Sequence, residues 1–262
     1  MTAVSWERIG LAVDGRTILS SVTLAARAGE VMGLVGPNGA GKSALLRCAA
    51  GLVPGFVGAI EIGGTALGAL APVQRARRLA YLPQSGETAW PITVAAAVAL
   101  GRLAHGERSD APAAVAAVAA ALAAVGIDGL GPRRLDTLSG GERALALLAR
   151  ALAVEAPLLL LDEPCAALDP RGQLAAMALF RRLAAGGACV CVVLHDLSLA
   201  ARFCDRVAVL DRGRLVAQGP PAEVLDDTVL GTVYGVRGLR CVADGADILI
   251  PWAPLAGAGV VT

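Results

Sequence analysis

Residues 36–43, GPNGAGKS, follow the pattern G-x-x-x-x-G-K-[ST] of a loop that holds the phosphates of a nucleotide. The loop stands between an apolar run at residues 31–35, which predicts a buried strand, and a helical stretch that stops near Gly51. Glycines let backbone N–H groups turn toward one point, and the helix N-terminus adds partial positive charge there. We therefore expect a nucleotide site made by Gly36, Pro37, Asn38, Gly39, Ala40, Gly41, Lys42 and Ser43.

Lys42 is the only lysine among the 23 lysine and arginine residues of the chain. A compact ammonium enters such a loop as a point charge, whereas a planar guanidinium is wider and forked. We expect Lys42 to reach the β- and γ-phosphates and the Ser43 hydroxyl to bind Mg²⁺. The alternative is that one lysine fell on this position by chance.

Two carboxylates follow a second apolar run, at residues 156–164 with the sequence APLLLLDEP. Four consecutive leucines predict a buried strand, and Asp162 and Glu163 stand directly after them. Asp162 is the candidate for holding Mg²⁺, directly or through water, and Glu163 for the general base that activates an attacking water. The alternative is a pair of acidic residues that merely ends a strand.

A second candidate anion site lies in residues 137–152, TLSGGERALALLARAL. Ser139, Gly140 and Gly141 open a predicted helix with bare N–H groups, by the same physics as the phosphate loop. The chain already has one phosphate loop and one set of carboxylates, so we expect the second site to serve another molecule's nucleotide. Alone, an ordinary serine N-cap would be the better interpretation.

The remaining pattern predicts the fold class. Residues 188–196 form another apolar run, residues 206–219 are two alternating runs joined by a turn, and residues 86–154 are helical and rich in alanine. Strands that alternate with helices favour a parallel α/β sheet, into which the helical stretch is inserted as a separate lobe.

The phosphate loop, LSGGE, LLLLDEP, ALDP and a histidine after a strand, in this order, resemble the nucleotide-binding subunit of ABC transporters over about residues 4–225. The resemblance implies an α/β fold: a P-loop (RecA-like) core with an antiparallel β lobe and an inserted α-helical lobe at 86–154. The cassette would occupy residues 1–225, and residues 226–262 would be a short C-terminal extension. The implied activity is ATP hydrolysis with Mg²⁺ by a head-to-tail homodimer that holds two ATP molecules between its subunits.

The resemblance also implies residue roles. Ser139, Gly140, Gly141 and Glu142 would cap the partner's ATP, and Asp169 would lie in the loop that crosses to the partner. Gln84, in YLPQ, would contact Mg²⁺ and the attacking water. His195 would hydrogen-bond the γ-phosphate, with a satisfied core histidine as the alternative.

Two positions depart from the family pattern. Val13 stands where an aromatic residue often stacks on adenine, so we expect weak base discrimination, unless Trp6 folds over to stack instead. Ala144 and Leu145 replace a polar pair after LSGGE, which leaves the phosphate site unaffected.

Residues 90–105, WPITVAAAVALGRLAH, and the stretch GPPAEVLDDTVLGTVYGV resemble importer ATPases for iron–siderophore, haem and cobalamin complexes. Gly101, Arg102 and His105 match a Gly-Arg-x-Pro-His stretch of that group, in which Ala104 replaces proline; His105 could equally be a surface residue. The resemblance implies membrane permease subunits as partners, a substrate-binding protein as an indirect one, and a peripheral place on the cytoplasmic face of the membrane.

Composition limits the other classes of function. The net charge of +1 gives no electrostatic footprint for nucleic acid. The first residues, MTAVSWERIG, lack a basic start followed by an apolar run, so we expect no secretory signal. The apolar stretch 113–125 is too short and too rich in alanine for us to expect a membrane span. The six cysteines show no metal-ligand spacing, which indicates reduced thiols in the cytosol. An ABC ATPase for another cargo, or a non-transport one such as a cluster-assembly factor, remains the alternative.

Overall fold

The computed structural model describes residues 1–84, 91–243 and 246–255, and its centre is a six-stranded sheet of order β10-β9-β3-β8-β7-β6. All neighbouring pairs are parallel except β10 with β9. The strands are β3 (Val31–Val35), β6 (Leu79–Leu82), β7 (Leu158–Asp162), β8 (Cys189–Val193), β9 (Arg206–Asp211) and β10 (Arg214–Gly219). Three runs expected to be buried strands, at 31–35, 156–164 and 188–196, are confirmed, as is the hairpin at 206–219.

Helices cover one face of this sheet and a second sheet lies toward the other. The first face packs against α5 (Gly140–Leu152), α6 (Pro170–Ala185), α7 (Leu197–Phe203), α8 (Pro221–Val224) and α9 (Asp227–Tyr234). The second faces α1 (Lys42–Ala49) and the antiparallel lobe. That lobe has the strand order β2-β1-β4-β5, with β1 (Thr2–Val13), β2 (Arg16–Arg27), β4 (Val57–Ile62) and β5 (Thr65–Ala66). The antiparallel lobe expected from the resemblance is therefore present.

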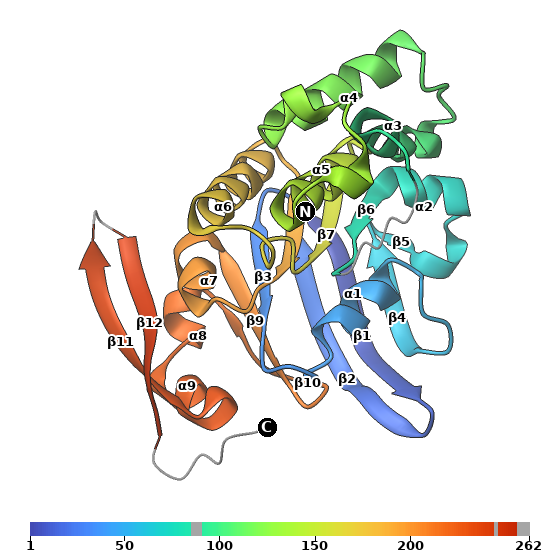
Figure 1. The fold of residues 1–262 in the computed structure, drawn as a ribbon. Coiled ribbons are helices and arrows are strands. Elements are labelled where there is room, and N and C mark those ends of the chain that lie inside the picture. Colours follow the sequence, from blue (N-terminus) through green and yellow to red (C-terminus); the bar gives the residue numbers. More distant parts are fainter. Residues whose placement is uncertain (85–90, 244–245, 256–262) are drawn as a thin grey trace.

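The helical lobe has an apolar cluster of its own and lies at one end of the molecule (Figure 1). Between β5 and β6 the chain forms η1 (Leu67–Ala69) and α2 (Pro72–Arg78). The lobe then contains α3 (Val94–Ala99), the 3₁₀ helix η2 (Leu100–His105), α4 (Pro112–Ala124), η3 (Asp128–Leu130), η4 (Leu135–Thr137) and α5. The first residues expected in this lobe, 86–90, lie outside the described part. Within the described part, none of the helices is both long and apolar enough to cross a membrane.

The end of the chain forms a small two-stranded sheet, β11 (Val236–Ala243) with β12 (Ala246–Pro254). It packs beside α7 and α9, away from the helical lobe, and Leu249 of β12 is buried in the main core (Figure 1). The division of the chain near residue 225 stays a prediction.

Candidate functional site

The predicted phosphate loop and the predicted carboxylates meet at the carboxyl ends of the central strands. The loop follows β3 and leads into α1, whereas Asp162 is the last residue of β7. The Ser43 hydroxyl donates to Oδ1 of Asp162 at 2.9 Å, across 119 positions of sequence. The parallel sheet therefore joins two motifs that the sequence keeps apart, at the edge where open α/β sheets bind ligands.

Two glycines of the phosphate loop have surroundings or conformations that disfavour any side chain. Gly36 has a φ of 148°, and a Cβ atom built on it would lie 2.0 Å from the backbone oxygen of Leu210. Gly41 has a φ of 98° and is the N-cap of α1. These constraints explain the glycines of the motif, which leave bare backbone N–H groups for an anion at the start of the helix.

Lys42 lies inside this loop and is only 5% exposed. Its Nζ donates to the carbonyl oxygens of Gly36 at 2.7 Å and Pro37 at 2.9 Å. Burial lowers the pKa of the Lys42 ammonium, and the nearby carboxylates of Glu163 and Asp162 oppose that shift. The loop thus holds a partly desolvated cation at the N-terminus of α1, where its attraction for a phosphate is stronger than in water.

Asp162 is fully buried and has two neighbours besides Ser43 that sequence reasoning missed. The Tyr81 hydroxyl, on β6, lies 3.5 Å from Oδ2 of Asp162 and receives a hydrogen bond from Nε of Arg47 at 3.4 Å. Burial raises the pKa of Asp162, and the hydrogen bond from Ser43 and the charge of Arg47 counteract it. Tyr81 belongs to the YLPQ stretch, so a signal existed, but its spacing does not show which way the side chain points.

Glu163 and His195 are in direct contact, with Nε2 of His195 2.6 Å from Oε1 of Glu163. Glu163 has a φ of 53°, in the left-handed region that non-glycine residues rarely adopt. Such a conformation costs about 1–3 kcal/mol and is concentrated at functional sites. His195 follows β8, the strand next to β7, so the adjacent strand ends bring the two side chains together. The sequence singled out both residues but not their contact.

Gln84 follows β6 and is exposed. Together with Glu163 and Arg143 of α5 it lines a cavity of about 160 Å³. The structure therefore places Gln84 beside the candidate base, at the junction of the core and the helical lobe. Its expected contact with Mg²⁺ stays a prediction.

Ser139 and Glu142 form a capping box at the N-terminus of α5. The Ser139 hydroxyl accepts from the backbone N–H of Glu142 at 3.3 Å, and Glu142 accepts from the backbone N–H of Ser139 at 2.9 Å. The hydrogen bond from the Ser139 backbone lowers the pKa of the half-buried Glu142. Gly140 and Gly141 form the first turn, and Ser139 and Gly140 are exposed. This helix end is therefore ordered and accessible to another molecule.

The other residues singled out by the resemblance lie on the surface or pack into the core. Asp169 is the N-cap of α6 and accepts from the backbone N–H of Gly172 at 2.7 Å. Ala144 and Leu145 are half-buried and pack against the main core. Their apolar character therefore matches their packing.

The interpretation of Trp6 as a stand-in for the missing adenine-stacking residue is wrong. Trp6 is 1% exposed, and its Nε1 donates to the backbone oxygen of Leu45 in α1 at 3.2 Å. The indole is thus a core residue that joins β1 to α1. Val13, at the end of β1, is 47% exposed.

A groove of about 460 Å³ between α2, η2 and the last turns of α5 was not expected from the sequence. Its lining is mostly apolar and includes the exposed side chains of Leu52 and Leu103. The guanidinium groups of Arg75 and Arg150 also line it, and burial lowers the pKa of Arg150.

Comparison with known proteins gives the family. The family model described as "ABC transporter" matches residues 19–166. The hemin import ATP-binding protein HmuV of Streptomyces coelicolor is 48% identical over 225 residues, which are 85% of this chain and 79% of that protein. The protein of the same name from Nocardia farcinica is 45% identical over 247 residues, 94% of this chain and 86% of that protein.

A solved structure shows the same fold. A putative metal-chelate type ABC transporter in an inward-facing conformation superposes with a TM-score of 0.82 at 23% identity, over 96% of this chain and 98% of that one. The family model covers more than half of the chain, and the phosphate loop meets the carboxylate Asp162 at one sheet edge. The chain belongs to the ABC transporter family, as one of its ATP-binding, ATP-hydrolysing subunits.

Proposed function

We propose that this ATP-hydrolysing subunit of an ABC importer powers the uptake of haem or a chemically similar metal chelate. The observation that carries the proposal is the Ser43–Asp162 contact, which joins the phosphate loop to the carboxylates and places Glu163 next to them. The cargo follows from the two relatives, which are named for hemin import and align with 85% and 94% of this chain.

Different residues of the site bind the phosphates and the metal ion. Lys42 and the N–H groups at the start of α1 hold the phosphates, and Ser43 and Asp162, with Gln84, hold Mg²⁺. The donor set fits this ion, because Mg²⁺ at nucleotide sites takes one or two carboxylates together with phosphate oxygens and water. The ion supplies neutralisation of the negative charge that develops on the transferred phosphoryl group.

Glu163 is the general base that accepts the proton of the attacking water. His195 contacts Glu163 and is 44% exposed at its side chain, so its ring is open to an incoming γ-phosphate. Glu163 has a left-handed backbone and makes this contact with His195 directly after the end of β7.

In a head-to-tail homodimer, the capping box at the N-terminus of α5 completes the ATP site of the partner subunit. Ser139 to Glu142 and the loop that ends at Asp169 contact the ATP that the partner's phosphate loop holds. Both segments are accessible on one subunit, as a shared site requires.

The permease subunits bind the groove between α2, η2 and α5, which holds the subunit against the cytoplasmic face of the membrane. The exposed Leu52 and Leu103 supply apolar contact, and Arg75 and Arg150 supply positive charge for a segment with an acidic side chain. A substrate-binding protein acts with this assembly only indirectly, through the permease.

Reconstitution tests this function directly. The chain is purified with the membrane proteins that accompany it and placed in liposomes, with ATP on its own side and haem on the other. We expect haem transport that needs ATP and disappears with Glu163→Gln. Transport of cobalamin or a ferric siderophore in preference to haem would replace the cargo, and purification without any membrane protein would favour a non-transport ATPase.

A further inference from the structure

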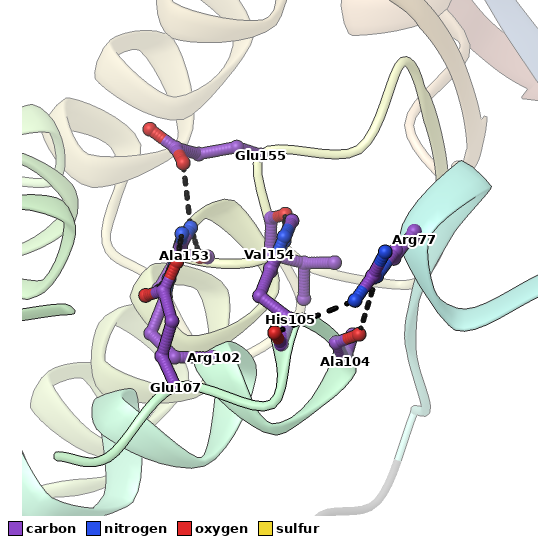
Figure 2. A network of polar contacts seen from close by, with 8 residues as sticks. All are labelled: Arg77, Arg102, Ala104, His105, Glu107, Ala153, Val154 and Glu155. Atoms are coloured by element: carbon purple, nitrogen blue, oxygen red, sulfur yellow. Dashed lines mark hydrogen bonds and ion pairs between the residues drawn. The ribbon is translucent and has the colours of Figure 1, made fainter. Parts of the chain in front are cut away.

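The 3₁₀ helix η2 carries a guanidinium that is almost fully enclosed by acceptors, as Figure 2 shows. The Arg102 side chain is 5% exposed, and its Nε and Nη2 donate to the two carboxylate oxygens of Glu107 at 2.9 and 2.8 Å. Its Nη1 donates to the backbone oxygen of Ala153 at 2.8 Å and to Glu155 at 2.5 Å. The acceptors come from η2's own loop and from the turn that follows α5, so Arg102 joins these two segments.

His105 and Arg77 extend this network to either side. Nε2 of His105 donates to the backbone oxygen of Val154 at 2.8 Å, since a carbonyl can only accept. Arg77 of α2 donates through Nε to the backbone oxygen of Ala104 at 2.8 Å (Figure 2). The open question about His105 is thereby answered: it is a half-buried, bonded residue.

The backbone of η2 lies directly on the last turn of α5. A Cβ atom on Gly101 would lie 2.5 Å from the backbone oxygen of Arg150, so only glycine fits at this distance. The carbonyl groups at the end of a helix carry partial negative charge and lack partners within the helix. Arg102 and His105 therefore bind the carbonyl groups of the two residues that directly follow α5, and Gly101 lets η2 approach the last turn of the helix.

The opposite end of α5 carries Ser139. The helix spans Gly140–Leu152, 13 residues and about 20 Å, and behaves as one rod. Its middle residues Ala146, Leu147 and Leu148 pack on the main core and on the cluster of the helical lobe, so a displacement at the C-terminal end moves the helix as a whole. The N-terminal end has the capping box, with Ser139 and Gly140 exposed, and an ion pair from Arg133 to Glu142 at 3.6 Å, whereas the C-terminal end is followed by the buried network of Arg102.

We propose that Arg102 is a positioning residue for the partner subunit's ATP: by holding the C-terminal end of α5 it places Ser139 against the nucleotide of the other subunit. The inference rests on the shared sites of the proposed homodimer and goes beyond them, because it assigns the control of one subunit's reaction to a buried arginine of the other. Arg102 is separated from Ser139 by the whole length of α5 and acts through this helix.

The variant Arg102→Lys separates positioning from charge. Lysine keeps the cation beside Glu107 and Glu155 but lacks the planar fork that bonds Glu107 and Ala153 at the same time. The matched control is Arg108→Lys, because Arg108 makes the same two-pronged contact with Asp110 on the surface, where its side chain is 85% exposed. Thermal unfolding of both variants shows whether the fold is kept.

Mixed dimers decide on which nucleotide Arg102 acts. Two differently tagged chains are co-expressed and purified by both tags, and the reference dimer pairs the wild-type chain with Lys42→Ala, which leaves one working site. In the opposite-chain dimer, Arg102→Lys is on the chain with the intact phosphate loop. In the same-chain dimer, it is on the Lys42→Ala chain, whose Ser139 completes the working site.

We expect the opposite-chain dimer to match the reference, and the same-chain dimer to hydrolyse ATP about tenfold more slowly, since a small misplacement of a contacting group costs up to about a hundredfold in rate. Equal rates in the two arrangements, whether both normal or both reduced, would overturn the proposal, because a general loss of stability affects both alike. Arg108→Lys is expected to change neither.

The same two arrangements with Ser139→Arg test the underlying dimer. A difference for Ser139→Arg without one for Arg102→Lys overturns only the positioning role. If Ser139→Arg gives no difference either, the shared site is absent, and both the proposed homodimer mechanism and this inference are wrong.

Discussion

The phosphate-loop region and the N-terminal end of α5 are built in opposite ways. At the phosphate loop, Lys42 and Asp162 are buried and bonded to groups of their own chain. At α5, Ser139 and Gly140 are exposed, and the capping box forms the end of the helix. The first region is complete within one chain, whereas the second is half of a site. One subunit should therefore bind ATP alone but should need another to use it.

The largest effect is expected from a substitution of Glu163, the proposed general base in the phosphate-loop region. In Glu163→Gln, the amide keeps the shape and still bonds His195, but it cannot take a proton from water. We expect hydrolysis to fall by about 10²–10⁴-fold, the usual contribution of a general base, with ATP binding unchanged. Phosphate release and equilibrium binding measure the two quantities.

ATP should then hold the Glu163→Gln subunits together as a dimer that light scattering detects. Hydrolysis near the wild-type rate would remove Glu163 from the role of base. It would also imply that His195, 2.6 Å away, acts without it.

Lys42→Arg tests whether ATP binding at the phosphate loop depends on the shape of the cation as well as on its charge. The ammonium fits between two carbonyl oxygens at 2.7 and 2.9 Å, and a forked guanidinium has no such room at 5% exposure. Hydrogen bonds to a charged group contribute about 1.5–3 kcal/mol, so we expect ATP affinity to fall about 10- to 100-fold. Titration with a fluorescent nucleotide measures the change, and Arg108→Lys is the control. Normal affinity would mean that the single lysine has no special fit.

The part of the site that could be predicted from sequence is the part whose geometry is local. The phosphate loop fixes its own shape through Gly36 and Gly41, and the capping box needs only the spacing of Ser139 and Glu142. The motifs also indicated where strands end, because the phosphate loop and the two carboxylates each follow an apolar run. The fold followed because buried strands read as unbroken apolar runs between helical stretches.

Contacts between distant side chains could not be predicted in this way. The approach of His195 to Glu163 depends on β8 lying next to β7 and on a left-handed backbone at one residue. The core position of Trp6 depends on how α1 packs across β1. The role of Arg102 depends on η2 touching the end of α5, about 50 residues later in the chain. Spacing alone carries none of this information.

Val13→Tyr introduces the aromatic residue that the sequence lacks at the expected adenine-stacking position. Base stacking on an aromatic ring gives about 1–3 kcal/mol and tolerates every base. Val13 is 47% exposed, so a larger ring has room, and we expect nucleotide binding to tighten about tenfold. The unmodified chain should hydrolyse GTP within about tenfold of ATP, because the phosphates are the same. Strong preference for ATP in the isolated subunit would show that another group reads the base.

The smallest effect on ATP affinity is expected from Ser139→Arg, which tests directly whether the N-terminal end of α5 is half of a shared site. Ser139→Arg places a long cation at the N-terminal end of α5 and removes its N-cap, which costs about 1 kcal/mol of stability. It touches none of the contacts of Lys42 or Asp162 in its own chain's phosphate-loop region. We therefore expect the affinity of the dilute single subunit for ATP to stay within about twofold of normal. Dimer formation by Ser139→Arg in the Glu163→Gln background should nevertheless be lost, because the arginine meets the partner's nucleotide. A light-scattering titration with ATP separates these two quantities on one sample. A marked loss of ATP affinity in the monomer would mean that α5 reaches the nucleotide of its own chain, and the two regions would then be parts of one complete site.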